Sequence, residues 1–574
     1  MKILKSKNYY LFFALLLLVV SSCEITDLDI NTDPNNASEA SLNLLLTSAQ
    51  FEGVNTFAGG LNNATMGFQG INTSNDDFNF TNGSWNGTWN FLYSGPLKDL
   101  EEIISGADPE VNPNYLGIAQ IMKAYYFTTM VDLWGDVPYS EAFKGNAEET
   151  ITEPVYDSGA SIYADAFLLI DQGITNLAKS QGVSVKGDII YGGNLTRWRK
   201  AAKSLKLKLL INTRNVNSNT AAIQTLISEG DLILSGSNDF QLRFSSLKNP
   251  DNRHPMYQAG YAGGEAGYSY FGHQLMYEML SSKDPRTPFY FKRQTTTILD
   301  PEDPTAKQTI PCSQRDDCVY NYFVTSSKVT NGIFGVDPDG LTDSQASYLA
   351  GFFGRDRSDP SGIPNDNPLR TTVGAYPAAG LFDKSAGLTG GNKFGVGDGI
   401  FPIISSWMVK FWMLEAQIAL NVNTGYTESD LLAEAIGDQM KKVISVGTSA
   451  DPQASSDISN WPNLYSWPIV FKTENEYINS IISDYPTSGS SNQRLNTVLK
   501  HAWFANFGNG FEGYNSFRRT GFPSDIQAPL QLIRQFALSF PYAQDEINLN
   551  PNTPQKAYDS PSAAIFWDTL KFQF

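Results

Sequence analysis

Cysteine and histidine, the side chains on which many metal sites and nucleophilic enzymes depend, are scarce in this chain. Its 574 residues hold only three of each. The histidines, His254, His273 and His501, are far apart in sequence, and neither an H-E-x-x-H zinc signature nor a G-x-S-x-G nucleophile motif occurs. The phosphate-binding loop G-x-x-x-x-G-K-S/T is missing as well. A Ser-His-Asp site could still assemble from distant residues, but no motif indicates one, and we expect neither catalysis nor an organic cofactor.

Basic residues are outnumbered, with 41 Lys and Arg against 59 Asp and Glu and a formal net charge of −18. Binding to nucleic acid relies on neutralising phosphates, so this balance argues against a nucleic-acid partner. The local exception is the basic segment Arg197–Arg214. It could be a phosphate patch, but we interpret its charges as the solvated face of an amphipathic helix.

No hydrophobic run is long enough to span a bilayer, which takes about 20 apolar residues. The apolar run Leu11–Val20 follows three lysines and precedes two serines and Cys23. A basic start, a short apolar core and small residues before a cleavage site are typical of a secretory signal peptide, here residues 1–22. Cys23 directly after the serines resembles a lipobox, in which the thiol is acylated and becomes the mature N-terminus. The alternative is a plain signal peptide with an incidental cysteine.

Residues 23–40 are polar and acidic, which suits a solvated tether between a lipid anchor and a folded body. Acyl chains on Cys23 would hold the protein at a membrane surface. The acidic residues after the cysteine, Glu24, Asp27 and Asp29, resemble the export signal of surface lipoproteins in the Bacteroidetes group. We therefore expect a lipid-anchored, surface-exposed protein of the outer membrane.

Helical periodicity dominates the first half of the chain and returns near residue 407. Apolar residues recur at spacings of three and four in Leu116–Trp134, Tyr163–Leu177, Trp198–Leu209 and Trp407–Ile418. A further stripe follows in Leu431–Val443, after a break. Helices joined by short turns predict a mainly α fold built from tetratricopeptide-like helix pairs.

The remaining stretches are rich in Gly, Pro, Asn, Asp and aromatic residues. The predicted organisation is one domain over residues 41–574. Its helical scaffold covers about 41–235 and 405–447, and loop-rich regions cover about 236–404 and 448–574. Loops this long inside a compact domain are usually functional.

Two aromatic segments stand out as candidate ligand-binding loops, namely Gly67–Trp85 and Arg253–His273. Flat rings suit the apolar faces of sugars and side chains, and neighbouring Asn and Asp can hydrogen-bond hydroxyls or amides. The alternative is that these rings pack the loops onto the scaffold. The candidate residues are Phe78, Phe80, Trp85, Tyr257, Tyr261, Tyr268 and Tyr270.

Two further candidates lie in the loop-rich region. Cys312 and Cys318 could form a local disulfide outside the cytoplasm, where such bonds persist. Asp337, Asp339 and Asp343 surround a Gly-containing turn and could bind a structural calcium ion, although the EF-hand spacing is missing and a simple turn is favoured.

A pair of carboxylates can hydrolyse a glycosidic bond, and Asp132 and Asp136 are the obvious pair at a predicted helix end. The alternative is capping and turn chemistry around Gly135 and Pro138, which we favour.

Several motifs together resemble the SusD/RagB-like family of outer-membrane lipoproteins. They are WNFLY (Trp89–Tyr93), DLWGDVPYSEAF (Asp132–Phe143), WRKAAKSLKLKLL (Trp198–Leu210), KDPR (Lys283–Arg286), GRDRSDPSG (Gly354–Gly362), GAYPAAG (Gly374–Gly380), FEGYNSFRRTGFP (Phe511–Pro523) and Phe566–Asp568. The last has a phenylalanine where the family's pattern has a second tryptophan.

The resemblance implies tetratricopeptide-like helix pairs that carry an irregular, loop-rich half. It implies a TonB-dependent, SusC-like barrel as partner and glycans, ahead of peptides, as ligands. It also implies that ligands are held by loops in about the two aromatic regions. Two rival hypotheses are a surface polysaccharide hydrolase and a purely structural surface scaffold.

Overall fold

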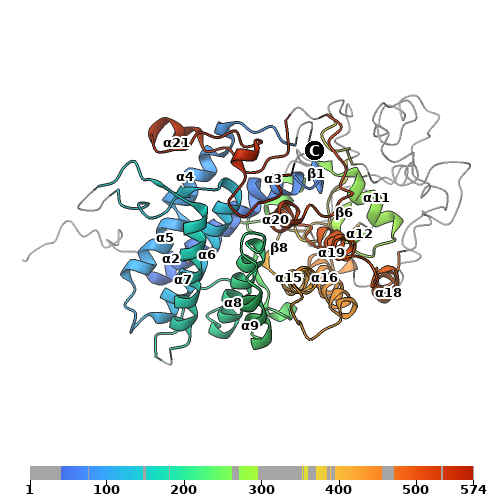
Figure 1. The fold of residues 1–574 in the computed structure, drawn as a ribbon, viewed down its shortest axis with the longest axis horizontal. Coiled ribbons are helices and arrows are strands. Elements are labelled where there is room, and N and C mark those ends of the chain that lie inside the picture. Colours follow the sequence, from blue (N-terminus) through green and yellow to red (C-terminus); the bar gives the residue numbers. More distant parts are fainter. Residues whose placement is uncertain are drawn as a thin grey trace, which may run out of the picture.

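The computed structural model describes residues 41–74, 77–145, 150–179, 181–261, 270–294, 352, 354–359, 370–383, 388, 395–454, 471–531 and 534–572. Within these ranges the chain is mainly helical (Figure 1), as the periodicity predicts. None of the described helices has the length and apolar character that crossing a bilayer would need.

The first group of helices comes from residues 42–229. It comprises α2 (Leu42–Thr56), the π-helix η1 (Phe57–Leu61), α3 (Asn62–Gly67), the 3₁₀ helix η2 (Asn82–Trp85), α4 (Asn86–Ser94), α5 (Pro96–Gly106), α6 (Pro113–Trp134), α7 (Gly159–Leu177), α8 (Leu195–Asn212) and α9 (Thr220–Glu229).

The second group contains the remaining helices. They are η3 (Gly236–Asn238), α10 (Pro255–Tyr261), α11 (His273–Ser281), α12 (Thr287–Tyr290), α15 (Ser406–Leu420), α16 (Glu428–Ala450), α18 (Glu474–Asp484), α19 (Ser491–Ala505), α20 (Gly510–Thr520), α21 (Gln544–Leu549) and η7 (Pro561–Ala563).

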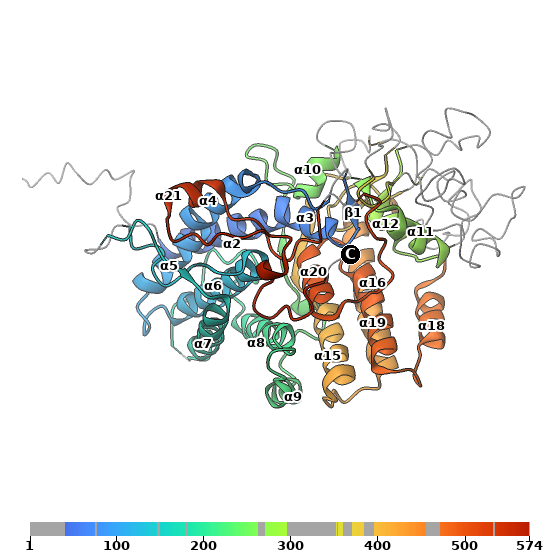
Figure 2. The same ribbon diagram turned by 45° about the horizontal axis from the view of Figure 1, so that its top comes forward.

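The long helices form a continuous row in which each packs on the next (Figure 2). α5 packs on α6, α6 on α7, α7 on α8, and α8 on both α9 and α15; α15 then contacts α16 and α19. Between α6 and α7 the backbones come close, because a Cβ on Gly117 would lie 2.9 Å from the carbonyl oxygen of Gly173. The tetratricopeptide-like helix pairs predicted from the sequence are confirmed.

Strands of two to five residues pair segments that are separated in the sequence. They form four antiparallel pairs: β1 (Asn72–Thr73) with β5 (Tyr270–Phe271), β2 (Val137–Pro138) with β3 (Tyr156–Asp157), β4 (Phe240–Arg243) with β8 (Ile400–Ile404), and β6 (Phe291–Lys292) with β7 (Thr372–Val373). In Figure 2, α10, α11, α12 and β1 lie on the upper side of the molecule, above the row of long helices.

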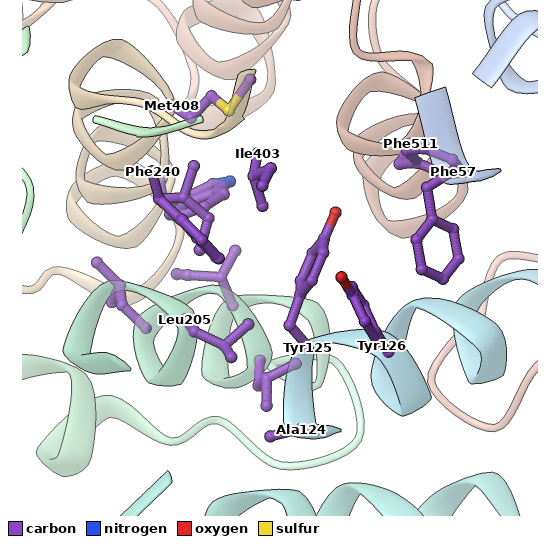
Figure 3. Close-up of a cluster of buried hydrophobic side chains, with 14 of the residues drawn as sticks. Phe57, Ala124, Tyr125, Tyr126, Leu205, Phe240, Ile403, Met408 and Phe511 are labelled. Carbon is purple, nitrogen blue, oxygen red and sulfur yellow. The ribbon is translucent and has the colours of Figure 1, made fainter. Parts of the chain in front are cut away.

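The core lies where α6, α8, β4, β8, η1 and α20 meet. Figure 3 shows Tyr125 and Tyr126 of α6 side by side, with Phe240 on one side of them and Phe57 and Phe511 on the other. Phe57 of η1 lies 5.4 Å from the ring of Tyr126 and 6.0 Å from that of Phe511. Many of the aromatic residues of the chain are therefore packed in the core.

The basic segment Arg197–Arg214 coincides with α8, and its lysines form ion pairs with acidic residues of neighbouring segments. Lys206 pairs with Asp171 of α7 at 2.6 Å, and Lys203 with Glu229 of α9 at 3.0 Å. The interpretation as the polar face of a packed helix therefore holds for these lysines.

The region after residue 448 differs from the expectation of loops. Helices α18, α19 and α20 lie there, and both α18 and α19 begin with a reciprocal capping box, Thr473 with Glu476 and Ser490 with Gln493. Each box satisfies two of the amide groups that a helix start leaves without a partner. The prediction of loops over this region is therefore wrong for α18, α19 and α20, although α19 carries apolar residues at helical spacing.

Candidate functional site

The two segments proposed as ligand-binding loops meet in the structure. Asn72 of β1 pairs with Phe271 of β5, and Thr73 with Tyr270. The amide of Gly272 extends the pairing by donating to the carbonyl oxygen of Ile71 at 2.9 Å. A Cβ on Gly272 would lie 1.9 Å from the carbonyl oxygen of Gly70, so only glycine permits this approach.

A cavity of about 290 Å³ adjoins this strand pair, bounded also by η1, α10 and β7. This volume is close to the lower end of ordinary ligand pockets, about 300 Å³. The lining residues are Ala58, Gly59, Gly60, Asn62, Asn63, Met66, Asn72, Pro255, Met256, Ala259, Gly260, Tyr270, Phe271, Thr371, Thr372 and Val373.

The π-helix η1 supplies the glycine-lined part of the cavity. Its Gly59 departs from helical geometry, with φ −82° and ψ −126°, and a Cβ there would meet no atom within 4 Å. Gly59 and Gly60 thus leave open space where side chains would otherwise stand. The chain is therefore kinked at Gly59, between α2 and α3, rather than continuing as a regular π-helix.

Two carboxamides on this side of the cavity have different roles. Asn62 is fully buried and ties the start of α3 to the segment before α20: its Nδ2 donates to the Gly508 carbonyl at 3.2 Å, and its Oδ1 accepts from the Gly510 amide at 2.7 Å. Asn63 is exposed, and its Oδ1 accepts from Nδ2 of Asn72 at 2.6 Å. Asn63 is therefore the exposed carboxamide on the polar side of the cavity, and the buried Asn72 holds it in place.

The opposite wall, formed by α10 and β7, is held by close contacts. Gly260 of α10 packs so closely on β7 that a Cβ there would lie 2.5 Å from Oγ1 of Thr372. The hydroxyl of Tyr261 donates to the Val373 carbonyl at 2.7 Å and accepts from the Leu381 amide at 3.0 Å. These contacts fix Met256, on the same helix, as part of the wall.

Of the proposed ligand contacts, Phe78 and Trp85 belong to the buried core, and the half-buried Phe80 packs against it. Phe78 is 1% exposed and Trp85 is 6% exposed. Phe80 stacks on Phe540 at 5.8 Å, and Trp85 stacks on the same ring at 4.9 Å. These aromatics hold the Gly67–Trp85 segment on the C-terminal part of the chain, which corrects their assignment to an open binding surface.

Of the described tyrosines of the second segment, Tyr270 lines the cavity, and Tyr257 and Tyr261 belong to α10, which forms one of its walls. Tyr257 and Tyr261 stack face to face on α10, with ring centroids 4.7 Å apart. Tyr270 lines the cavity but is only 8% exposed, and the Arg370 guanidinium lies 3.9 Å from its ring centroid.

Other proposed residues lie outside the described ranges. They are Cys23, Tyr268, Cys312, Cys318, Asp337, Asp339 and Asp343.

The sequence reasoning missed Asn63, Asn72, Met256 and the glycine pair of η1 as cavity residues. One local feature of the sequence marks these residues: the Gly59-Gly60 pair, followed by Asn62-Asn63, interrupts a segment that is otherwise typical of a helix. Consecutive glycines within a helical pattern indicate a bend or a close approach and could have marked the site.

The two carboxylates considered for hydrolysis, Asp132 and Asp136, both accept hydrogen bonds from other parts of the protein. Asp132 is 2% exposed and accepts hydrogen bonds from the hydroxyl of Tyr163, from Nδ2 of Asn515 at 2.7 Å and from Nε1 of Trp567 at 3.0 Å. Asp136 is exposed and accepts from the Gly159 amide, at the start of α7, at 2.8 Å. Asp136 thus has the capping role that the turn interpretation gives it, whereas Asp132 joins separate segments through buried side-chain hydrogen bonds.

Comparison with known proteins concerns the family and the fold. Residues 34–318 match a SusD-like family described as starch-binding and associating with the outer membrane. No curated protein matches the chain in sequence. Residues 34–318 belong to the SusD-like family that the motifs resemble.

Solved structures of SusD homologues share the fold over nearly the whole chain. A SusD/RagB family protein from Bacteroides thetaiotaomicron is 17% identical, with a TM-score of 0.64, covering 92% of this chain and 99% of its own. A SusD homologue from Bacteroides fragilis is 17% identical, with a TM-score of 0.62 and coverages of 92% and 99%. A chitin-binding SusD homologue from Flavobacterium johnsoniae is 15% identical, with a TM-score of 0.61 and coverages of 92% and 98%.

Proposed function

We propose that this protein is a non-catalytic, lipid-anchored receptor that binds nutrient oligomers, glycans ahead of peptides, at the outer membrane. Acylated Cys23 anchors it, and a TonB-dependent, SusC-like barrel receives the ligand. The observation that carries the proposal is the cavity at the β1–β5 pair, formed within a SusD-like fold by the two segments proposed for binding. The likeness to a chitin-binding homologue supports a glycan ligand.

The chemistry of the lining supports binding rather than turnover. Glycoside hydrolysis needs two carboxyl groups beside the scissile bond, and general acid–base catalysis needs a titratable side chain within reach. The cavity's described lining includes no Asp, Glu, His, Lys or Arg.

Filling the cavity tests where the ligand binds. Ala259 is exposed on α10 and lines the cavity, so Ala259→Trp places a bulky ring at its wall. Calorimetry would compare binding of the tightest ligand from a panel containing maltohexaose, cellotetraose, chitotetraose and blocked peptides. We expect affinity to fall at least about 10-fold, or about 1.4 kcal/mol.

The matched control is Ala222→Trp, at an exposed alanine of α9 on the side of the molecule opposite α10 (Figure 2). It should bind as the unmodified protein does. Unchanged affinity in Ala259→Trp would place the ligand elsewhere, and product release from a polysaccharide would favour the hydrolase hypothesis.

Loss of the proposed anchor tests the localisation. Cys23→Ala removes the thiol that would carry the acyl chains, each CH₂ of which contributes about 0.8 kcal/mol to membrane binding. We expect a folded protein that moves from the membrane pellet to the soluble fraction after cell fractionation. The double variant Cys312→Ala/Cys318→Ala serves as the control and should stay in the pellet. A Cys23→Ala protein that still sediments with membranes would contradict the lipid anchor.

A further inference from the structure

A second cavity lies among helix ends, away from the β1–β5 pair. It is formed where α8, α15 and α20 end and α19 begins, and its volume is about 350 Å³. In Figure 2 the lower ends of α15 and α19 lie on the side of the molecule away from α10. The two cavities share no lining residue, so the second one is a separate site.

Arginines rather than acids face this second cavity. Its described lining includes Arg214 and Arg519 and no Asp or Glu. Both guanidinium groups bind the carboxylate of Glu415, which lies outside the lining and is 1% exposed. Two cations thus share one bridging anion, and an anionic ligand on the cavity side would bring them a second.

Arg214 keeps a donor available for such a ligand. Its Nε donates to Oε1 of Glu415 at 2.6 Å, and its Nη1 donates to Oδ1 of Asn215 at 2.9 Å, whereas no described residue accepts a hydrogen bond from its Nη2. Arg519 differs, because its Nε and Nη2 donate to Glu415 and its Nη1 donates to Asn212. Arg214 is therefore held in place and still has an unused N–H group, which suits it to bind a carboxylate or another oxyanion.

The rest of the lining has the chemistry that a sugar unit needs. Asn421, Ser491 and Asn492 are exposed and bring carboxamide and hydroxyl groups, which can hydrogen-bond sugar hydroxyls. Phe522 and the 48% exposed Leu570 add apolar surface for the C–H groups of a sugar ring. The cavity is also larger than a single ion requires, since ordinary ligand pockets begin at about 300 Å³.

We propose that this second cavity binds a uronic acid unit of an acidic glycan, with the sugar carboxylate on Arg214 and the sugar hydroxyls at the exposed asparagines and serine. The choice of a sugar rests on the proposed function. The site itself goes beyond that function, because it is independent of the cavity at the β1–β5 pair.

Calorimetry with a matched pair of ligands on the full mature protein tests the role of charge. Tetragalacturonate and its fully methyl-esterified form share one backbone and one set of hydroxyl groups, and only the first carries carboxylates. We expect the free acid to bind at least about 10-fold tighter, the effect of one hydrogen bond to a charged group. Sodium phosphate and sodium sulfate, tested alone, should each bind at least about 10-fold more weakly than tetragalacturonate, because neither engages the groups that bind the sugar.

Asn492→Asp tests the place of binding with little disturbance of the fold. Asn492 is exposed, lines the cavity and is the second residue of α19, where an acidic side chain is favourable to the helix. The new charge lies beside the proposed carboxylate, so we expect tetragalacturonate affinity to fall about 5-fold or more. Asn475→Asp is the matched control, because Asn475 is exposed, is the second residue of α18 and lies outside the cavity lining. It should leave the affinity unchanged.

Arg214→Gln removes the proposed partner of the carboxylate and leaves Glu415 bound to Arg519. The preference for tetragalacturonate over its methyl ester should then disappear. Should this variant fail to fold, Asn492→Asp still decides the place of binding. Ala259→Trp, which fills the first cavity, should leave tetragalacturonate affinity unchanged.

The outcomes separate this inference from the proposed function. Equal binding of the acid and its ester would overturn the uronic acid site and leave capture of neutral glycans at the first cavity standing. Loss of tetragalacturonate binding in Ala259→Trp but not in Asn492→Asp would move the acidic ligand to the first cavity and overturn the second site. Phosphate or sulfate bound as tightly as tetragalacturonate would overturn the uronic acid assignment in favour of a simple anion site. Binding of tetragalacturonate at Arg214, with no neutral oligosaccharide bound, would support this site and count against the first.

Discussion

Replacing Glu415 by glutamine is expected to lower the free energy of unfolding by about 3 kcal/mol at pH 7, because the buried Arg519 and the half-buried Arg214 lose the carboxylate that bridges them. Oε1 of Glu415 accepts from Nε of Arg214 at 2.6 Å and from Nε of Arg519 at 2.7 Å, and Oε2 accepts from Nη2 of Arg519 at 2.8 Å. The three residues join α15 to the ends of α8 and α20. Removing the charge from one partner of a buried ion pair leaves the other without compensation.

The size of this effect should depend on pH in a defined direction. Burial alone would raise the pKa of Glu415, but the adjacent Arg519 and Arg214 outweigh it and lower the pKa from 4.5 to about 2. A carboxyl with a lowered pKa stabilises the fold fully above its unfolded pKa of 4.5 and loses that contribution as the pH falls through about 2. The stability difference between the two proteins should therefore shrink progressively below about pH 4.5.

Denaturant unfolding at several pH values would measure both effects. Glu434→Gln provides the control, because Glu434 is 45% exposed and its buried partner Lys410 keeps a second carboxylate, that of Asp438, at 2.8 Å. We expect this loss of an exposed charge to cost about 0–1 kcal/mol. A Glu415→Gln protein as stable as the control at pH 7, or a difference that grows on acidification, would show that Glu415 does not hold the two arginines as the geometry implies.

The helical scaffold could be predicted from the sequence because its signal is local. The apolar stripes in Leu116–Trp134 and Tyr163–Leu177 lie within α6 and α7 and end at the same residues as these helices. Spacings of three and four are the signal that predicted these helices. The same signal failed for α19, although Leu495, Val498, Leu499 and Ala502 have helical spacing. Its helix start is marked by a capping box that a search for apolar stripes overlooks.

The site could be predicted only as a region. Strand pairing between Asn72 and Phe271 joins residues about 200 positions apart, and two-residue strands carry no periodic signal. Aromatic content also failed to separate surface from core: Phe78 and Trp85 looked like ligand contacts but pack in the core of the fold. The residues that reach the cavity, such as Asn63 and Met256, are common types whose role comes from tertiary placement alone.

Removal of Asp132 is the second change for which we expect a large loss of stability. Its carboxylate joins α6 to three other parts of the chain, through Tyr163 of α7, Asn515 of α20 and Trp567 near the C-terminus. All four residues are buried. In Asp132→Ala, the hydroxyl, amide and indole donors would lose their common acceptor in a region that water does not reach, and a buried donor without a partner costs about 1–3 kcal/mol.

We therefore expect Asp132→Ala to lower the free energy of unfolding by about 4 kcal/mol or more, measured by denaturant titration. Asp171→Ala, which breaks only the exposed pair with Lys206, should cost about 1 kcal/mol or less. Because Asp132 lies outside the cavity lining, the fraction of Asp132→Ala that remains folded should bind its ligand with unchanged affinity. An Asp132→Ala protein as stable as the wild type would show that the shared carboxylate is dispensable for folding. If that stable variant had also lost a hydrolytic activity that the wild type possesses, Asp132 would be a candidate catalytic acid.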